Sequence, residues 1–244
     1  MDENTLKHLR NILFIDIETV SQEPHLDLLD ERIKELWLKK AGYLHNNDNL
    51  PDADFYLKRS SIYAEFGKIV CIGIGGIFLD DTQEPTLRVK MIRGEAEAEV
   101  LEQFKTILEK HKAGANLMLC AHNGKEFDFP YICRRMLVNG ITLPRILQVT
   151  GKKPWEINHI DTLDLWKFGD FKHYVAQDLL AAIFGIPGGT TEVSGDLINT
   201  IYYQERDKAK IERYCADSII VLTQLYMKMN NWPLINENNI EVIL

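Results

Sequence analysis

The residues most able to do chemistry in this chain are acidic, and two of them interrupt an apolar segment near the N-terminus. Asp16 and Glu18 lie within the run ILFIDIETV at positions 12–20. A continuous apolar run predicts a strand that is covered on both faces. Residues two apart on a strand point to the same side, so the two carboxylates share a face. Either the strand ends there and the acids reach solvent, or they are held in place by a partner such as a metal ion.

A second acidic site follows the run CAHNGKEFDFP at positions 120–130. A short predicted strand at 116–120 leads into His-Asn-Gly, which is a turn signal. Asp128 then comes at the start of a predicted helix, where its charge suits the positive end of the helix dipole. Taken alone, Asp128 is explained as a helix-start residue and Asn123 as a turn residue.

The third acidic site is Asp217, in a long predicted helix at 208–230. Tyr214 precedes Asp217 by three residues and Ser218 by four, so all three share one face of that helix. An isolated aspartate on a helix is ordinarily a solvated charge, and Asp217 alone would indicate nothing more.

Together, the carboxylates of Asp16, Glu18, Asp128 and Asp217 indicate a metal site. Oxygen ligands of this kind suit Mg²⁺ or Mn²⁺ better than zinc. Two such ions roughly 3.5–4 Å apart would stabilise the attacking and the leaving oxygen of a phosphodiester. Tyr214 could orient the attacking water by a hydrogen bond. We therefore expect two divalent cations as cofactors and these five side chains as the catalytic residues.

The elements that must position these residues alternate between strands and helices. Strands are predicted at 12–20, 68–74, 86–92 and 116–120, with a turn at Gln83-Glu84-Pro85 that indicates a meander. Helices are predicted at 28–39, 95–110, 129–138, 177–184 and 208–230, and residues 158–166 read as a strand that turns helical. This order predicts an α/β fold with a central mixed β-sheet flanked by α-helices, the order of a ribonuclease H-like fold. We expect a single domain over 1–244, with an insertion at 21–66 after the first strand in which 46–54 is a loop.

Composition limits the classes of function. The chain has 244 residues, 45% of them hydrophobic, and a net charge of −8 from 36 acidic and 28 basic residues. That charge excludes bulk electrostatic binding of nucleic acid, so any such binding needs a local site. No apolar run approaches the ~18–20 residues of a membrane helix, and no secretory signal is visible. Four widely spaced cysteines favour a reducing compartment, so we expect a cytoplasmic protein without a membrane partner.

Three segments resemble the exonuclease motifs of the DEDD 3′–5′ exonuclease superfamily: FIDIET at 14–19, HNGxxFD at 122–128 and RYCxD at 213–217. The resemblance is to its Tyr-bearing branch, and within it to predicted 3′–5′ exonucleases related to the proofreading domain of family B DNA polymerases. Further likenesses are KEFDFP at 125–130, His159-Ile160-Asp161 and Gly185-Ile186-Pro187-Gly188. The similarity covers roughly residues 11–233.

The resemblance implies a role for each matching position. Asp16, Glu18 and Asp128 would be metal ligands, and Asn123 and Phe127 would line the site. Thr19 and Val20 would approach the terminal nucleotide. The family implies removal of nucleotides from a 3′ end with release of 5′-monophosphates, so the expected partner is nucleic acid, with single-stranded DNA 3′ ends as substrate.

The third motif departs from the family pattern, in which the tyrosine precedes the aspartate by four residues. Ser218 occupies that place here, and the acid is Asp217. A shift of one residue turns a side chain by about 100° around a helix. We expect Asp217 to be the fourth ligand; alternatively the second metal is held poorly, or Asp161 or Asp164 substitutes. A second-sphere role for the His159–Asp161 segment, with His159 bonded to the backbone, is the simpler interpretation of that segment.

The leading hypothesis is a metal-dependent 3′–5′ exonuclease acting on single-stranded DNA. The alternatives are an exoribonuclease of the same fold, a nucleic-acid-binding module that Ser218 has impaired as a catalyst, and a ribonuclease H-type endonuclease or transposase. Basic residues are candidates for phosphate contacts, at Lys58, Arg59, Arg134, Arg135, Lys152 and Lys153. Of the aromatic residues Phe55, Tyr56 and Tyr63, at least two are expected to pack in a core rather than stack on bases.

Overall fold

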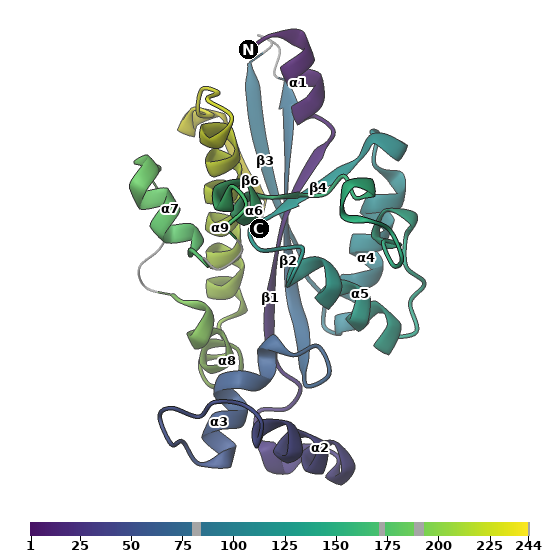
Figure 1. Ribbon diagram of the computed structural model, residues 1–244, viewed down its shortest axis with the longest axis vertical. Coiled ribbons are helices and arrows are strands. Elements are labelled where there is room, and N and C mark those ends of the chain that lie inside the picture. Colours follow the sequence, from purple (N-terminus) through teal and green to yellow (C-terminus); the bar gives the residue numbers. More distant parts are fainter. Residues whose placement is uncertain (80–83, 171–173, 188–192, 244) are drawn as a thin grey trace.

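A six-stranded mixed sheet, in the order β5-β4-β1-β2-β3-β6, forms the centre of the molecule. The computed structural model describes residues 1–79, 84–170, 174–187 and 193–243. The strands are β1 (Ile12–Ser21), β2 (Gly67–Leu79), β3 (Pro85–Ile92), β4 (Met118–Ala121), β5 (Ile160–Asp161) and β6 (Ile240–Ile243). The helices are α1 (Glu3–Leu9), α2 (Glu31–Ala41), α3 (Asp52–Arg59), α4 (Glu97–Lys110), α5 (Asp128–Val138), α6 (Thr162–Lys167), α7 (Gln177–Phe184), α8 (Ile198–Thr200) and α9 (Lys208–Met229). In Figure 1 the sheet lies between α4 and α5 on one side and α9 with α7 on the other.

Strand β1 is apolar on both faces because each face meets a different layer of helices. It pairs antiparallel with β2 and parallel with β4. Phe14 and Val20 belong to the core cluster that includes α9, whereas Ile15 and Ile17 belong to the cluster that includes α4 and α5. The predicted strand covered on both faces is confirmed. The alternation also assigns Asp16 and Glu18 to the face that meets α9.

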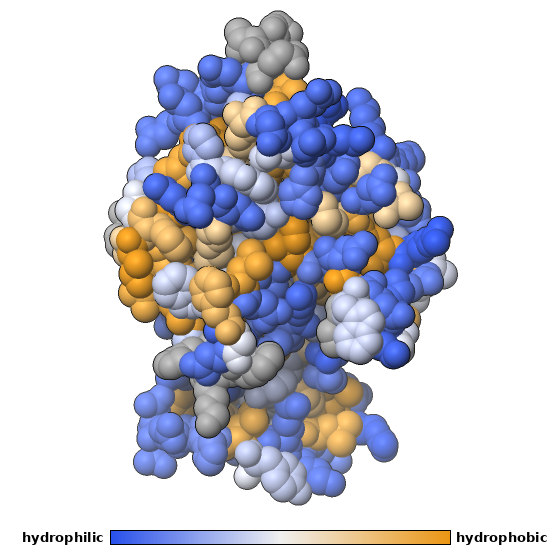
Figure 2. Space-filling model, turned by 45° about the horizontal axis from the view of Figure 1, so that its top comes forward, coloured by the Kyte–Doolittle hydropathy of each residue, from blue (hydrophilic) through white to orange (hydrophobic). Residues whose placement is uncertain are grey.

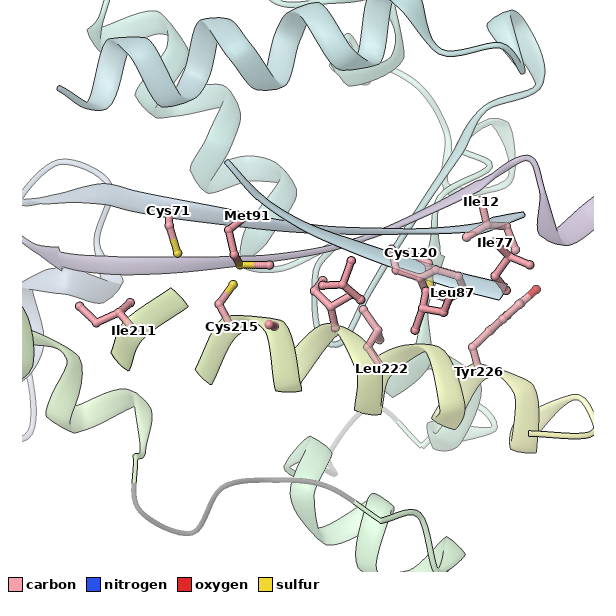
Figure 3. Packing of buried hydrophobic residues seen from close by; sticks show 14 of the residues in the cluster. Ile12, Cys71, Ile77, Leu87, Met91, Cys120, Ile211, Cys215, Leu222 and Tyr226 are labelled. Atoms are coloured by element: carbon pink, nitrogen blue, oxygen red, sulfur yellow. The ribbon is translucent and has the colours of Figure 1, made fainter. Parts of the chain in front are cut away.

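The core between the sheet and α9 positions the long helix along the strands that carry the acids. Figure 3 shows Cys71 and Met91 of the sheet above Cys215 of α9, and Leu87 and Cys120 above Leu222 and Tyr226. Burial of these apolar side chains, at about 25 cal/mol per Å² of surface removed from water, holds α9 against the sheet.

The segment between β1 and β2 has its own small core around Trp37, which is fully buried. Phe55 and Tyr56 are buried there, with ring centroids 6.3 and 5.4 Å from that of Trp37. The expectation that at least two of the three aromatics serve as core is confirmed. The predicted loop at 46–54 is wrong in its second half, since α3 begins at Asp52, where acids in the first turn suit the helix dipole.

The other predicted strands and helices are present, and short elements account for most of the differences. The strand that turns helical near 160 is β5 followed by α6. Helix α1 and strand β6 were not predicted, because seven and four residues are too short to show a clear periodicity. Gln83 of the expected turn and Gly188 of the similar segment lie outside the described residues.

The face shown in Figure 2 is mostly hydrophilic. Hydrophobic side chains gather on the flank that carries α7 (Figure 2), where Leu179 and Ile183 are exposed. Among the described residues, no helix combines the length and apolar character needed to cross a membrane.

Candidate active site

Two carboxyl groups lie in the middle of β1 beneath α9. Asp16 pairs in register with Gly73 of β2, and Glu18 pairs with Cys71. Burial raises the pKa of Asp16 to about 7, although the N–H of Ile17 and the hydroxyl of Ser218 partly counteract it. Burial also raises the pKa of Glu18 well above its ordinary value, and the charges of Asp16, Cys71 and Asp128 raise it further. These two acids therefore stand where an ionised carboxylate is costly without a cation.

Asp128 joins these acids from the neighbouring strand. Strand β4 runs parallel to β1, so both carboxyl ends lie at the same edge of the sheet, and the chain then turns into α5 with Asp128 as its first helical residue. Asp128 is 3% exposed, and its Oδ1 has no hydrogen-bond partner among the residues that the structure describes. Burial raises its pKa well above the usual value, and the charge of Asp16 raises it further. A carboxylate oxygen without a partner, beside the buried Glu18 and the partly buried Asp16, is the arrangement expected of a cation ligand.

The carboxylate of Asp161 anchors the turn that places Asp128. The Asn123 N–H donates to Asp161 Oδ1 at 2.9 Å, and the Lys125 N–H donates to Oδ2 at 3.0 Å. Asp161 also caps α6 by accepting the N–H of Leu163 at 2.9 Å. Asn123 has a φ of +60°, a conformation that Asn tolerates better than most residues. The expected second-sphere anchor is thus present, and Asp161 uses its oxygens on backbone groups.

His159 is held by the backbone, as expected. The Leu119 N–H donates to its Nδ1 at 3.4 Å, and its Nε2 lies 3.1 Å from the carbonyl oxygen of Ile146.

Helix α9 presents three side chains to the acids. The Cys215 Sγ lies 3.8 Å from the Asp16 carbonyl oxygen and 4.0 Å from Asp16 Oδ2. The hydroxyl of Ser218 interacts with the Asp16 carboxyl and lowers its pKa. The pKa of the Tyr214 phenol is raised by burial and then by the charges of Glu18 and Asp16, so the phenol keeps its proton at neutral pH. Ligand atoms of Asp16, Glu18 and Cys215 all lie within 4.8 Å of one another.

Asp217 lies beside this group rather than in it. It is half-buried, and burial raises its pKa, but no neighbouring charge contributes to that rise. Within the described part of the chain, no hydrogen bond or ion pair joins Asp217 to the other acids. Its role as fourth ligand stays a prediction, while Cys215 and Ser218 are residues of α9 that interact with Asp16.

The expected substrate-binding residues divide into two groups. Thr19, Asn123 and Phe127 are half-buried around the acids, and the Phe127 ring lies 5.3 Å from that of Tyr131. Val20 is fully buried in the α9 core, so contact between Val20 and a nucleotide would require its side chain to leave that core.

One candidate phosphate contact is part of the interior. Arg135 is 4% exposed, and its Nη2 lies 2.6 Å from Glu97 Oε2 in a buried ion pair. Its Nη1 donates to the carbonyl oxygen of Ala64 at 2.8 Å. The interpretation of Arg135 as a phosphate contact is therefore wrong, because every side of the guanidinium faces protein.

Sequence reasoning missed that Cys215 contacts the acidic site. The signal was available in its position three residues before Ser218, which places both on one side of α9. An apolar helix face makes a buried cysteine look like ordinary core, and only the packing of α9 on β1 shows the contact.

Close approach of α9 to the sheet depends on glycine in β2. A Cβ at Gly75 would lie 2.6 Å from Ile219 Cγ2 and 3.3 Å from Leu87 Cδ1. We expect Gly75→Ala to lower the free energy of unfolding by about 1–3 kcal/mol, the usual cost of overpacking. Gly195→Ala is the matched control, because a Cβ there has no neighbour within 4 Å. Urea denaturation of both variants measures the difference, and equal stabilities would contradict this close packing.

The comparisons with known proteins agree with this geometry. Residues 62–233 match a family described as "Predicted 3'-5' exonuclease related to the exonuclease domain of PolB". That range includes Asp128 and Tyr214 and begins after Asp16 and Glu18. The chain is similar in structure to the family B DNA polymerase from the hyperthermophilic archaeon Pyrobaculum calidifontis, at a TM-score of 0.55 and 14% identity, over 90% of this chain and 24% of that one. The chain thus spans about a quarter of the polymerase. This likeness and the sheet order confirm the ribonuclease H-like α/β fold. No curated protein matches the chain.

Proposed function

The chain belongs to the family of predicted 3′–5′ exonucleases related to the exonuclease domain of PolB. From this membership we propose that it removes nucleotides from the 3′ end of single-stranded DNA by hydrolysing phosphodiester bonds, with divalent cations as cofactors. The observation that carries the proposal is a group of three acids, with Glu18 and Asp128 buried and Asp16 partly buried, in which the charge of Asp16 raises the pKa of the other two. Asp128 also has a carboxylate oxygen without a partner among the described residues. A core gains nothing from such a group, whereas a cation site requires it.

The donor set fits the expected metals. Asp16, Glu18 and Asp128 offer carboxylate oxygens, which are the ligands that Mg²⁺ and Mn²⁺ prefer. When bound, two such ions supply positive charge on the scissile phosphate and a water of lowered pKa. The Ser218 hydroxyl favours the ionised form of the Asp16 carboxyl, because it lowers the pKa of that group.

The chain's own side chains complete the chemistry. Tyr214 keeps its proton and lies close to Glu18 and Asp16, so its phenol is available to orient the attacking water. Phe127 and Asn123 flank the acids and would contact the terminal nucleotide through its base and sugar. The net charge of −8 restricts nucleic-acid contact to this local site.

The proposal is tested with 5′-labelled single-stranded DNA and RNA of one sequence, in Mg²⁺, Mn²⁺ or EDTA. We expect a descending ladder on DNA that disappears in EDTA and in Asp16→Asn. A ladder on RNA alone would assign an exoribonuclease. Binding of either strand without cleavage would assign a binding module, which the serine at position 218 favours as the second candidate.

The third motif makes a separate prediction. Ser218→Asp adds a carboxylate beside Asp16, and we expect cleavage to rise about tenfold and the Mn²⁺ requirement to fall, because the second cation gains a ligand. Asp217→Asn should change the rate by less than about threefold, since no charge of the other acids contributes to the pKa of Asp217 and no hydrogen bond joins it to them within the described residues. Initial rates against metal concentration measure both effects. The opposite pattern, with a large loss in Asp217→Asn, would make Asp217 the fourth ligand.

Stability should depend on pH and metal together. The pKa of Asp16 is raised from 3.8 to about 7, so its contribution to folding is full below pH ~4 and is lost as pH rises toward 7. We expect the protein in EDTA to lose thermal stability across that window. A cation holds the carboxylates ionised and stabilises the fold by about 2.7 kcal/mol at 100 times its Kd, so the difference between Mn²⁺ and EDTA should widen as pH rises. A gap that is constant from pH 5 to 8 would contradict the site.

A further inference from the structure

A groove on the outer side of α5 is built for binding and is separate from the acids. Its volume is about 520 Å³, within the ~300–1,000 Å³ range of ligand pockets. It lies between α5 and the segment 143–159. Apolar side chains dominate its lining, among them Leu137, Leu143, Leu147, Val149 and Ile157.

The floor of the groove is fixed. Leu147 and Phe129 are buried, and the Cys133 thiol donates to the Leu147 carbonyl oxygen at 3.7 Å. The His159 ring lies 5.0 Å from that of Phe129 and is itself held by the backbone. At the mouth, Leu137 is 65% exposed. A fixed apolar floor with a large exposed leucine at its edge is typical of a surface that binds another molecule.

Three cations and one acid, Asp164, line the groove, so its local charge is positive on a chain whose net charge is −8. Arg134 and Lys152 line it, are exposed, and form no ion pair within the part of the chain that the structure describes. Lys125 also lines the groove, with its Nζ 3.1 Å from Asp164 Oδ2. The pKa of His159 is lowered by burial and further by the charges of Lys152 and Lys125, which places both cations close to the floor.

A positively charged rim could attract either nucleic acid or an acidic peptide, and the side chains that line the groove favour the peptide. Nucleobases are held by stacking on exposed aromatic faces, but Phe129, an aromatic residue of this lining, is 5% exposed. Aliphatic walls instead suit bulky apolar side chains, and an amphipathic helix presents these at i, i+3 and i+4. We propose that this groove binds an acidic peptide segment of a partner protein, with apolar anchors over Leu137 and Leu147 and carboxylates on Arg134 and Lys152.

The position of the groove relates the partner to the acids. Helix α5 carries Asp128 at its first residue and Phe129 and Leu137 along the groove. A peptide seated here would lie against the same helix that supplies a carboxyl to the site. The partner would therefore be held next to the proposed nuclease centre without covering it.

The test is a selection of short random peptides displayed on phage against the whole chain. We expect enriched peptides to be net acidic with large apolar residues at helical spacing. Fluorescence anisotropy then measures the affinity of fluorescein-labelled copies of these peptides. We expect the affinity to fall about tenfold or more in Leu137→Asp, because this substitution removes a central anchor. Arg134→Glu should also weaken binding, and a peptide whose acids are replaced by lysine should prefer Arg134→Glu over the unaltered protein.

Control variants separate the groove from the rest of the surface. Leu179→Asp alters another exposed leucine, on α7, and should leave binding unchanged. Circular dichroism and thermal melting establish that the exposed variants fold. The inference is overturned if no acidic peptide is enriched, if Leu137→Asp and Leu179→Asp bind alike, or if labelled oligothymidylate rather than peptide loses affinity in both groove variants.

Discussion

Replacing Asp128 by asparagine is expected to reduce cleavage by at least about a thousandfold while making the metal-free protein more stable. The loss corresponds to about 4 kcal/mol of transition-state stabilisation. It follows from removing an anionic oxygen from the cation site. The gain follows because a buried carboxyl with an unpartnered oxygen and a raised pKa is replaced by a neutral amide whose NH₂ can donate to Asp16 or Glu18. A gain of about 1 kcal/mol would raise Tm by about 2–4 °C.

Calorimetry in EDTA and a cleavage assay in Mn²⁺ measure the two effects on one preparation. Glu126→Gln is the matched control, because Glu126 is an exposed acid in the same turn and should change neither quantity. A variant that loses both activity and stability would indicate that Asp128 is a structural residue of α5. A variant that still cleaves would remove it from the site.

Asp128→Asn is expected to lower activity and raise stability because a cation site requires carboxyl groups that destabilise the metal-free protein. Carboxyls held apart from solvent and from counter-charges destabilise the empty protein, and binding of the ion offsets that cost. This is also why the acids were recognisable in the sequence: Asp16 and Glu18 break an apolar strand at positions where the alternation calls for core residues.

Local pattern could predict the strands and helices that carry the site, but not how they meet. The apolar run at 12–20 and the turn before Asp128 place two groups of acids at the carboxyl ends of strands, and β1 and β4 prove to be neighbours. Which side of α9 faces the sheet is decided by packing. Ile219 and Cys215 fill the space that Gly73 and Gly75 leave, and this packing directs Ser218 toward Asp16 and leaves Asp217 to one side.

The same limit explains Arg135 but not Val20. A basic residue in a helix reads as a surface charge, yet Arg135 finds Glu97 from α4, 38 positions away in the chain. Val20 lies two residues after Glu18, which suggested a contact with substrate. The alternation along β1 places its side chain in the core beneath α9. The contact of Arg135 with a distant segment has no signal in a single sequence, whereas the alternation along β1 was available to place Val20.

Among substitutions outside the proposed metal ligands, Asp161→Ala is expected to lower the stability of the protein most. It would leave the N–H groups of Asn123 and Lys125 without their acceptor and remove the cap of α6. An unpaired buried donor costs about 1–3 kcal/mol, the low end applies to these part-buried N–H groups, and a lost cap costs about 0.5–2 kcal/mol, so we expect a loss of about 2–4 kcal/mol in the free energy of unfolding. Asp164→Ala is the control, because the exposed Asp164 carboxylate forms ion pairs with Lys125 and Lys167 and accepts no backbone N–H among the described residues.

Activity distinguishes a positioning role for Asp161 from a purely structural one. The turn that it holds sets the start of α5, so loosening the turn displaces Asp128 from Asp16 and Glu18. In conditions where Asp161→Asn is still folded, with one oxygen left to accept an N–H, we expect kcat to fall and the metal requirement to rise while strand affinity changes little. If Asp161→Asn instead keeps the kcat and metal requirement of the unaltered protein, Asp128 must be placed by the packing of α5 alone, and the turn would serve stability without positioning the acids.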